Sequence, residues 1–282
     1  MNINKAILFM ILSIICFAFM NAIVKYLQSF NTYQIIFFRA LGTLFFTIPL
    51  LMKQNISFLG THKKLLFFRG IVGVISLTCF FLSLNYLAIG TAVSIRYTSP
   101  IFAAILALIF IKEKVKSIQW LFFTVAFIGV LIIKGFGEAV NSFGLLLIII
   151  SAFFQGLVFV IIRKLGDKEN PLVIINYFMI MALLFGGIMS INYWKTPNIL
   201  ELLLLISLGI LGFIGQLYMT KAFQSNETNI VAPLKYLEVI FSIIIGVFWF
   251  GEIYNLLTLF GVVLILLGLI FNIYIKQKNN TL

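Results

Sequence analysis

The chain of 282 residues is 62% hydrophobic and only 10% charged, and its mean hydropathy is +1.16. Soluble domains have about 25% charged residues, so this composition excludes a soluble globular domain. The net charge of +12 would indicate nucleic-acid binding in a soluble protein. Here the basic residues stand between apolar runs rather than on one face of a domain, so we expect no nucleic-acid partner.

Apolar segments bounded by charged or turn residues follow one another along the whole chain. Each is close to the length of about 20 residues that a helix needs to cross a bilayer. The segments cover residues 6–28, 32–52, 66–87, 91–111, 117–134, 142–164, 171–191, 199–222, 228–250 and 255–275. The sequence therefore predicts an all-α polytopic membrane protein with ten transmembrane helices in contact with the lipid bilayer.

The distribution of Lys and Arg predicts the orientation, because positive charges are retained on the cytoplasmic side. With the N terminus inside, fourteen basic residues fall on the inner side and only Lys25, Lys134 and Lys195 on the outer side. The inner set is Lys5, Lys53, Lys63, Lys64, Arg69, Lys112, Lys114, Lys116, Arg163, Lys164, Lys168, Lys221, Lys276 and Lys278. We expect a protein of the cytoplasmic (inner) membrane with both termini in the cytoplasm.

The two halves of the chain match each other without gaps over their most polar spans. Arg96-Tyr97 falls on Lys235-Tyr236, and Glu113 falls on Glu252. The glycines Gly70, Gly73 and Gly129 likewise fall on Gly209, Gly212 and Gly268. Because five spans are an odd number, the halves enter the membrane from opposite sides. We expect two inverted five-helix repeats, residues 1–139 and 140–282, that hold a substrate at their interface near the midplane.

Ionisable side chains inside spans cost several kcal/mol unless they face a partner or a wet cavity, which makes them functional candidates. Glu238 is the only acid deep in a span, and Lys235 lies three residues earlier on the same helical face. Glu238 is therefore a candidate for proton coupling, with a structural ion pair as the alternative. Arg96 and Lys235, one toward each mouth of a central cavity, would suit an anionic or zwitterionic substrate. The alternative is that each side chain reaches to its own interface.

Several other residues are weaker candidates. Tyr97 and Tyr236 join the predicted substrate-binding set because they recur in the repeat, and Arg39 is a candidate for lining the path. Hydrogen-bonding or stacking candidates are Asn85, Gln155, Gln216 and Trp249. Pro100 and Pro233 interrupt the fourth and ninth spans, where we expect plain kinks. Glu113 and Glu252 are interpreted as solvated charges at helix ends.

Metal, cofactor and covalent chemistry have no support in the sequence. His62 is the only histidine, and Cys16 and Cys79 lie in separate apolar segments without metal-ligand spacing. No nucleophile, base and acid occur in a triad-like pattern. We therefore expect no metal, no cofactor and no enzymatic activity.

The endings Pro100–Glu113 and Glu238–Glu252, with Lys221-Ala222-Phe223 before the second, resemble those of EamA-type members of the drug/metabolite transporter superfamily. The resemblance implies a carrier of amino acids or other small polar metabolites that works by alternating access. It also implies that the third, fourth, eighth and ninth spans line the cavity. Val239 stands where the family often has proline, so no kink is expected there.

Three alternatives stay open. The run from Lys221 to Glu238 is similar to that of S-adenosylmethionine carriers, which favours an uptake carrier for S-adenosylmethionine or a nucleoside-type compound. A membrane enzyme or lipid-handling protein would need catalytic polar groups clustered at one interface, and the sequence shows none. The third alternative is a non-transporting accessory subunit. The sequence leaves the substrate, the direction, the coupling ion and a homodimeric state open.

Overall fold

The computed structural model describes residues 3–112, 117–134 and 141–253, with short helical pieces between 256 and 271. Every regular element within those ranges is a helix. The α-helices are α1 (Ile3–Tyr26), α2 (Thr32–Lys53), α3 (Lys63–Ser83), α4 (Ile89–Arg96), α5 (Ser99–Phe110), α6 (Ser117–Lys134), α7 (Ser142–Leu165), α8 (Pro171–Ser190), α9 (Ile199–Ser225), α10 (Thr228–Val231) and α11 (Leu237–Phe250). Short 3-10 helices are η1 (Gly166–Lys168), η2 (Ile191–Tyr193) and η3 (Ala232–Tyr236). The all-α fold expected from the sequence is confirmed.

Seven helical segments in the described part of the chain are long and apolar enough to cross a membrane, and a shorter apolar helix spans Ser117–Gly129. The expected ninth span is divided among α10, η3 and α11. The expected tenth span, 255–275, lies largely outside the described residues, as does Glu113. A multi-pass membrane protein is therefore established, and the count of ten stays a prediction.

Asparagine begins four of the long helices. The side chains of Asn31, Asn141 and Asn170 each accept a hydrogen bond from a backbone N–H of the first turn. Asn198 forms a capping box with Glu201. The Asn198 side chain accepts a hydrogen bond from the Glu201 N–H, and the Glu201 carboxylate accepts one from the Asn198 N–H. These caps satisfy backbone donors that the first helical turn leaves unpaired, and so they fix where the spans start.

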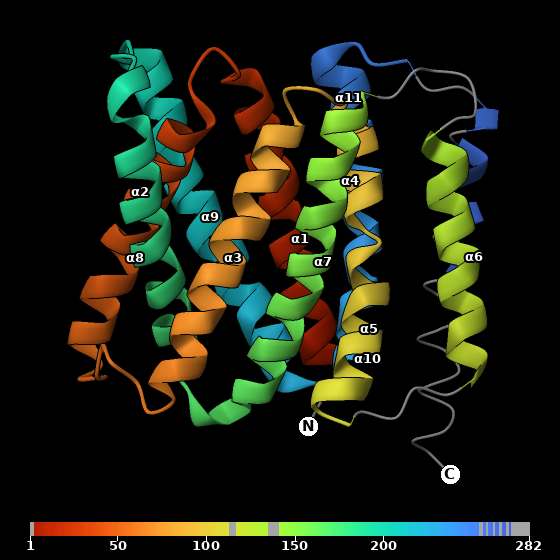
Figure 1. Cartoon of the computed structure of the whole chain (residues 1–282), viewed down its shortest axis with the longest axis horizontal. Coiled ribbons are helices and arrows are strands. Elements are labelled where there is room, and N and C mark those ends of the chain that lie inside the picture. The colour runs from red at the N-terminus through yellow and green to blue at the C-terminus, as the bar shows by residue number, and fades with distance from the viewer. Residues whose placement is uncertain are drawn as a thin grey trace.

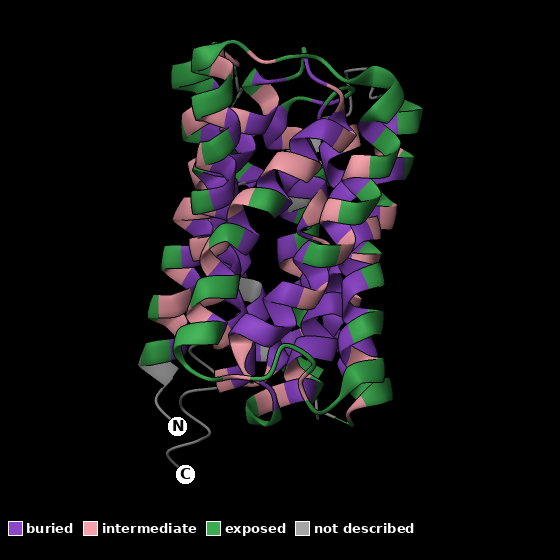
Figure 2. Ribbon diagram, turned by 90° about the vertical axis from the view of Figure 1, so that its left-hand side faces the viewer, coloured by how far each residue is buried: buried purple, intermediate pink, exposed green. Residues whose placement is uncertain are grey.

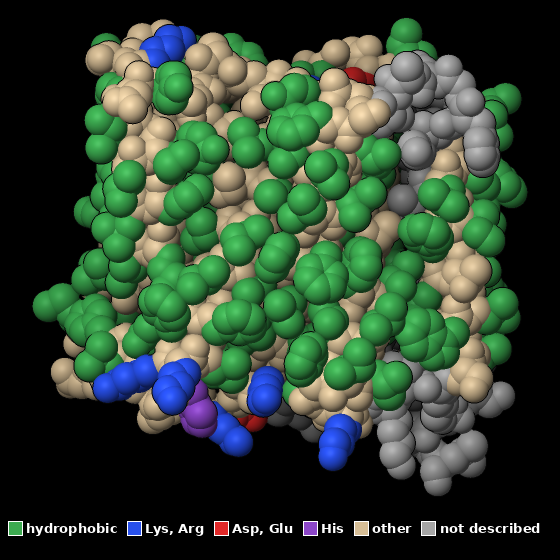
Figure 3. All heavy atoms as spheres, in the orientation of Figure 1, with side chains coloured by type: hydrophobic (Ala, Val, Ile, Leu, Met, Phe, Trp, Pro, Cys, Tyr) green, Lys and Arg blue, Asp and Glu red, His purple; other side chains and the backbone are tan. Residues whose placement is uncertain are grey.

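The helices stand side by side in one bundle, with α2 and α8 at one end and α6 at the other (Figure 1). Buried residues line the inside of the bundle and exposed ones its outside (Figure 2). The outside is nevertheless apolar, and hydrophobic side chains cover the broad face between the two edges (Figure 3). A helix bundle with an apolar surface of this width is suited to lipid rather than water.

The two edges of the bundle differ in charge. Lys and Arg side chains gather along the edge where α1 begins, at the bottom of Figure 3, and few appear at the opposite edge. Exposed members of this basic edge include Lys53, Lys63, Lys64, Lys164 and Lys168. We refer to the two sides as the basic edge and the opposite edge.

Two contacts between the halves involve positions that correspond to each other in the repeat. A Cβ on Gly209 would lie 2.4 Å from Gly42 Cα, and one on Gly70 would lie 2.3 Å from Met181 Sδ. The alignment that places Gly70 on Gly209 also places Gly42 on Met181. The contact of Gly42 with Gly209 therefore corresponds to the contact of Met181 with Gly70 when the two halves are exchanged. A two-fold relation between the repeats requires such a correspondence.

The expected fourth and ninth spans, which contain Pro100 and Pro233, are both interrupted. Helix α4 ends at Arg96 and α5 begins at Ser99, so the break falls on Tyr97 and Thr98. In the second half η3 ends at Tyr236, which is the partner of Tyr97 in the repeat. The first break lies two to three residues before Pro100, and η3 contains Pro233, so the expectation of plain proline kinks fits both places.

Candidate functional site

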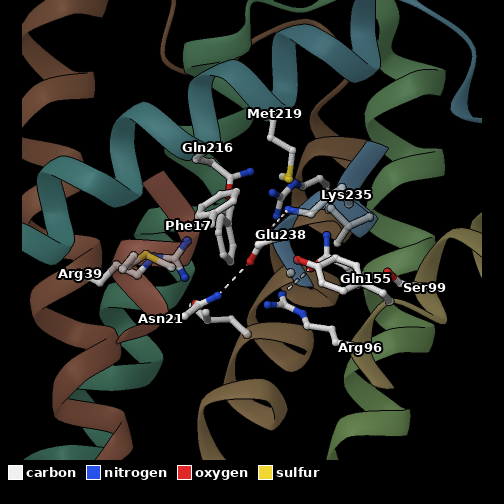
Figure 4. Close-up of a pocket in the computed structure, with 17 residues that line it drawn as sticks. Phe17, Asn21, Arg39, Arg96, Ser99, Gln155, Gln216, Met219, Lys235 and Glu238 are labelled. Atoms are coloured by element: carbon white, nitrogen blue, oxygen red, sulfur yellow. Dashed lines mark hydrogen bonds and ion pairs between the residues drawn. The ribbon is translucent and has the colours of Figure 1, made fainter. Parts of the chain in front are cut away.

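A small polar cavity lies in the middle of the bundle, between helices of both halves (Figure 4). Its volume is about 40 Å³. That is room for a few water molecules, whereas metabolite pockets occupy about 300–1,000 Å³. The cavity is therefore smaller than a metabolite pocket.

The only acid on the cavity wall within the described residues is Glu238, from the first turn of α11. Its Oε2 lies 2.9 Å from Lys235 Nζ, and its Oε1 accepts a hydrogen bond from Asn21 Nδ2 at 3.0 Å. The side chains of Lys235 and Glu238 are 9% and 2% exposed. The predicted pairing of the two residues is present, and it offsets part of the cost of burying both charges.

Arg96 reaches the same cavity from the end of α4. Its Nη2 donates to Gln155 Oε1 at 2.8 Å, and its guanidinium carbon lies 3.9 Å from the centre of the Phe80 ring. Gln155 Oε1 also accepts a hydrogen bond from Ser76 Oγ at 3.2 Å. Arg96 and Lys235 thus face one chamber. The expectation that each lies toward a different mouth of that chamber stays a prediction.

Tyr97 and Tyr236 are 2% and 1% exposed, and their rings meet with centres 6.0 Å apart. Tyr97 lines the cavity, whereas Tyr236 packs behind it. The structure therefore brings the five predicted site residues together, four of them on the cavity wall. Gln155 and Gln216 also line it. Trp249 does not, because it is 60% exposed on the outside.

Sequence reasoning missed Arg69 and Asn21. The sequence pattern places Arg69 among the inner-side charges, yet it is 1% exposed and lines the cavity with Arg39. It lies six residues inside α3, which is about 9 Å of helix rise, and this depth was the available signal. Asn21 is one amide in an apolar run, which alone gives no signal.

A contact between the two halves, which we call the Lys25–Glu252 clasp, lies at the opposite edge. The Lys25 ammonium contacts Glu252 Oε1, which also accepts the Ile89 N–H at 3.2 Å. This clasp ties the end of α1 to the start of α4 and to the residue that follows α11 at Gly251. The side chain of Glu252 is 14% exposed, so its interpretation as a solvated helix-end charge is wrong.

A second clasp lies at the basic edge, on Glu169 between η1 and α8. Glu169 Oε1 accepts hydrogen bonds from the Thr61 N–H at 2.7 Å, from Thr61 Oγ1 at 2.5 Å and from the His62 N–H. Burial disfavours the charged form, but the hydrogen bonds from Thr61 and His62 outweigh it and hold the pKa of Glu169 below its usual value. The clasp joins the loop before α3 to the loop before α8.

The sequence matches a transporter family, and the fold matches a solved structure. The model of the EamA-like transporter family matches residues 4–135 and again residues 142–274. One crystal structure has the same fold, with a TM-score of 0.79 at 15% identity over 94% of this chain and 95% of that one.

Relatives that match most of this chain bear transporter names. The chain is 29% identical to the pseudopaline exporter CntI of Pseudomonas aeruginosa, over 95% of each chain. It is 27% identical to an S-adenosylmethionine uptake transporter of Rickettsia conorii, over 95% of this chain and 92% of that one. It is also 27% identical to human solute carrier family 35 member G1, over 86% of this chain and 72% of that one. With the family model matching both halves, this chain belongs to the EamA-like transporter family.

Proposed function

We propose that this protein is a secondary active carrier that moves small polar metabolites, amino acids or related compounds, across the cytoplasmic membrane by alternating access. The observation that carries the proposal is the buried polar chamber between two repeat-related halves of an apolar bundle. Water-sized space lined by charged groups is costly inside a membrane protein, and it marks a substrate or ion path.

Alternating access would use the two breaks and the two clasps. The units 1–139 and 140–282 would rock against each other about the broken segments at Tyr97 and η3. The Lys25–Glu252 clasp would close the chamber at the opposite edge, and the Glu169 clasp would close it at the basic edge. Opening one clasp at a time would expose the chamber to one side only.

Substrate binding would use Arg96, Tyr97, Lys235 and Glu238, with Tyr236 supporting Tyr97 from behind. Glu238 would couple transport to protons, because protonation of its carboxylate would release Lys235 for a ligand. The distance of 2.9 Å between the two charged groups makes their states interdependent.

The charge distribution supports an orientation with both termini in the cytoplasm. The basic edge would face the cytoplasm by the positive-inside rule. The Lys25–Glu252 clasp would then face the outside. Import and export use the same cycle, so the fold does not choose between them.

An uptake carrier for S-adenosylmethionine is the second candidate. It is favoured by the Rickettsia relative, which carries that name and matches 95% of this chain. The charges of the cavity wall argue against S-adenosylmethionine. Four cations and one carboxylate line the chamber. S-adenosylmethionine is itself cationic, because it carries a sulfonium and an amine against one carboxylate.

Counterflow in liposomes that contain only the purified protein tests the proposal. Liposomes loaded with unlabelled amino acids should take up labelled amino acids faster than protein-free liposomes do, and S-adenosylmethionine loading tests the second candidate in the same assay. Exchange with neither class would contradict a carrier of these metabolites. An accessory subunit would also give no exchange, whereas a lipid enzyme would change the liposome lipids by mass spectrometry.

A further inference from the structure

Two arginines on the chamber wall have no acidic partner in the described part of the chain. Arg39, on α2, is 3% exposed, and Arg69, on α3, is 1% exposed. The Nε and Nη1 atoms of both are buried without a hydrogen-bond partner. At this depth neither guanidinium reaches water outside the bundle.

Both guanidinium groups lie beside one aromatic ring. The guanidinium carbons of Arg69 and Arg39 are 4.2 Å and 6.0 Å from the centre of the Phe178 ring, and that of Arg39 is also 5.7 Å from the Phe81 ring. Figure 4 shows Arg39 reaching toward the chamber from the side away from Gln155 and Arg96. Aromatic rings compensate a buried cation only in part. The arginine pair is thus held in place but not neutralised.

The rest of the described chamber wall provides no free acidic partner for Arg39 and Arg69. Glu238 is already engaged by Lys235 and Asn21. The unpartnered donors on the wall are on Arg39, Arg69, Arg96 and Gln216. Apart from the ion-paired Glu238 Oε2, the unpartnered acceptor there is Asn21 Oδ1. The described wall is therefore rich in cations and in donors, and it lacks acceptors.

We propose that Arg39 and Arg69 bind a carboxylate of the transported molecule, and that the substrate carries more carboxylates than amines. This inference rests on the proposed carrier function and narrows its substrate class. A guanidinium presents paired N–H groups that match both oxygens of a carboxylate, and two of them can enclose one such group. A second carboxylate would meet Arg96 and Lys235.

Binding by full-length protein in lipid nanodiscs tests the inference without transport. The probes are L-glutamate and succinate, each matched with an amide of the same size and zero net charge: L-glutamine, which keeps only the α-carboxylate and the ammonium group, and succinamide, which keeps no carboxylate. Thermal stabilisation and titration calorimetry should show binding of the two acids, with little binding of the amides. Arg39→Gln or Arg69→Gln should weaken acid binding about tenfold to a hundredfold.

Lys53→Gln is the matched control, because it removes one exposed cation at the basic edge and should leave acid binding unchanged. The ligand-free melting temperature separates the proposed role from a structural one. A substrate-binding arginine without a partner should be replaceable by Gln with equal or higher thermal stability, whereas a structural arginine should not.

Equal binding of acids and amides by the unsubstituted protein would overturn the inference, and so would acid binding that survives in both arginine variants. No binding of either acid at millimolar concentration would also overturn it. Counterflow of neutral amino acids with no charge preference would contradict the inference about the substrate but would still support the carrier function. Arginine-dependent acid binding without any vesicle transport would contradict the carrier function and leave only carboxylate binding by the two arginines.

Discussion

The rings of Tyr97 and Tyr236 meet edge to face, with centres 6.0 Å apart and planes at 67°. The two residues occupy the same position in the two halves of the chain. A residue that contacts its own counterpart must lie beside the axis that relates the repeats. This contact therefore marks the centre of the bundle, and α4 and η3 end there.

The first prediction concerns this contact. Tyr97→Ala and Tyr236→Ala should each destabilise the protein, and their effects should not add. An edge-to-face aromatic pair contributes about 0.5–1.5 kcal/mol beyond burial, so the double variant should be less destabilised than the sum by roughly that amount. Denaturant unfolding in detergent measures the cycle. Phe at either position should keep the ring contact, and additive effects of the Ala variants would refute the coupling.

The sequence predicts the architecture well where local chemistry decides it. Asn198 and Glu201 mark a helix start by their spacing, and the pairing of Lys235 with Glu238 follows from helical geometry. The match of Arg96 with Lys235 indicates the repeat. Apolar runs indicate the spans because lipid leaves the backbone few alternatives.

What the sequence leaves out depends on packing between distant helices. Arg69 stands near two lysines in the chain, and only the inward face of α3 shows that it belongs to the chamber. Asn21 becomes a site residue only because α1 packs against the start of α11, where it meets Glu238. Lys25 and Glu252 are 227 residues apart, and no local pattern links them.

The second prediction tests proton coupling by Glu238. Glu238→Gln keeps an oxygen that accepts from Asn21 but removes the charge that protons would titrate. We expect a pH gradient to drive no accumulation in proteoliposomes of this variant, while exchange without a gradient continues. Normal gradient-driven accumulation by the variant would rule Glu238 out as the coupling group.

The third prediction concerns the stability of the same ion pair. Removing one partner of a buried pair leaves an uncompensated charge and costs about 3–5 kcal/mol, so Glu238→Ala should destabilise strongly. Lys235→Met combined with Glu238→Met should recover most of that loss. Unfolding free energies of the two variants are compared in one detergent. A double variant as unstable as Glu238→Ala would show that other contacts dominate.

The fourth prediction concerns the clasp at the opposite edge. Glu252→Gln should weaken the contact with Lys25 by about 1 kcal/mol and raise the open population roughly fivefold. A cysteine placed at Ser99, which is 1% exposed on the chamber wall, reports opening by its rate of labelling with a charged thiol reagent. Cys16 and Cys79 are replaced by Ala beforehand.

Glu201→Gln is the control for this experiment. It weakens the 3.4 Å contact between Glu201 and Lys195, which lies at the same edge and within the second half, and its amide oxygen can still accept the Asn198 N–H. Labelling should then proceed as in the unsubstituted background. Equal acceleration by both substitutions would indicate general loosening of the edge instead of a clasp.

The fifth prediction is a pH dependence at the basic edge. The pKa of Glu169 is lowered in the folded protein, chiefly by hydrogen bonds from Thr61 and His62 that overcome burial. Its contribution to stability is therefore complete above the pKa of the unfolded chain and is lost as pH falls through the folded pKa. Melting temperatures in acid buffers should show this loss in the unsubstituted protein and a flatter profile in Glu169→Gln. A profile of equal slope in both would contradict the assignment.

The last prediction uses the exchanged glycine contacts. Gly209→Ala would place a Cβ 2.4 Å from Gly42 Cα, where backbone meets backbone and α2 must move away from α9. Gly70→Ala would meet Met181 Sδ at 2.3 Å, and this flexible side chain can turn aside. The two substitutions are equivalent in the repeat, yet Gly209→Ala should cost about 1–3 kcal/mol, the usual range for overpacking, and Gly70→Ala less. Unfolding in detergent measures both. Equal losses would mean that the methionine is as rigid as the backbone, and a larger loss at Gly70 would reverse the packing argument.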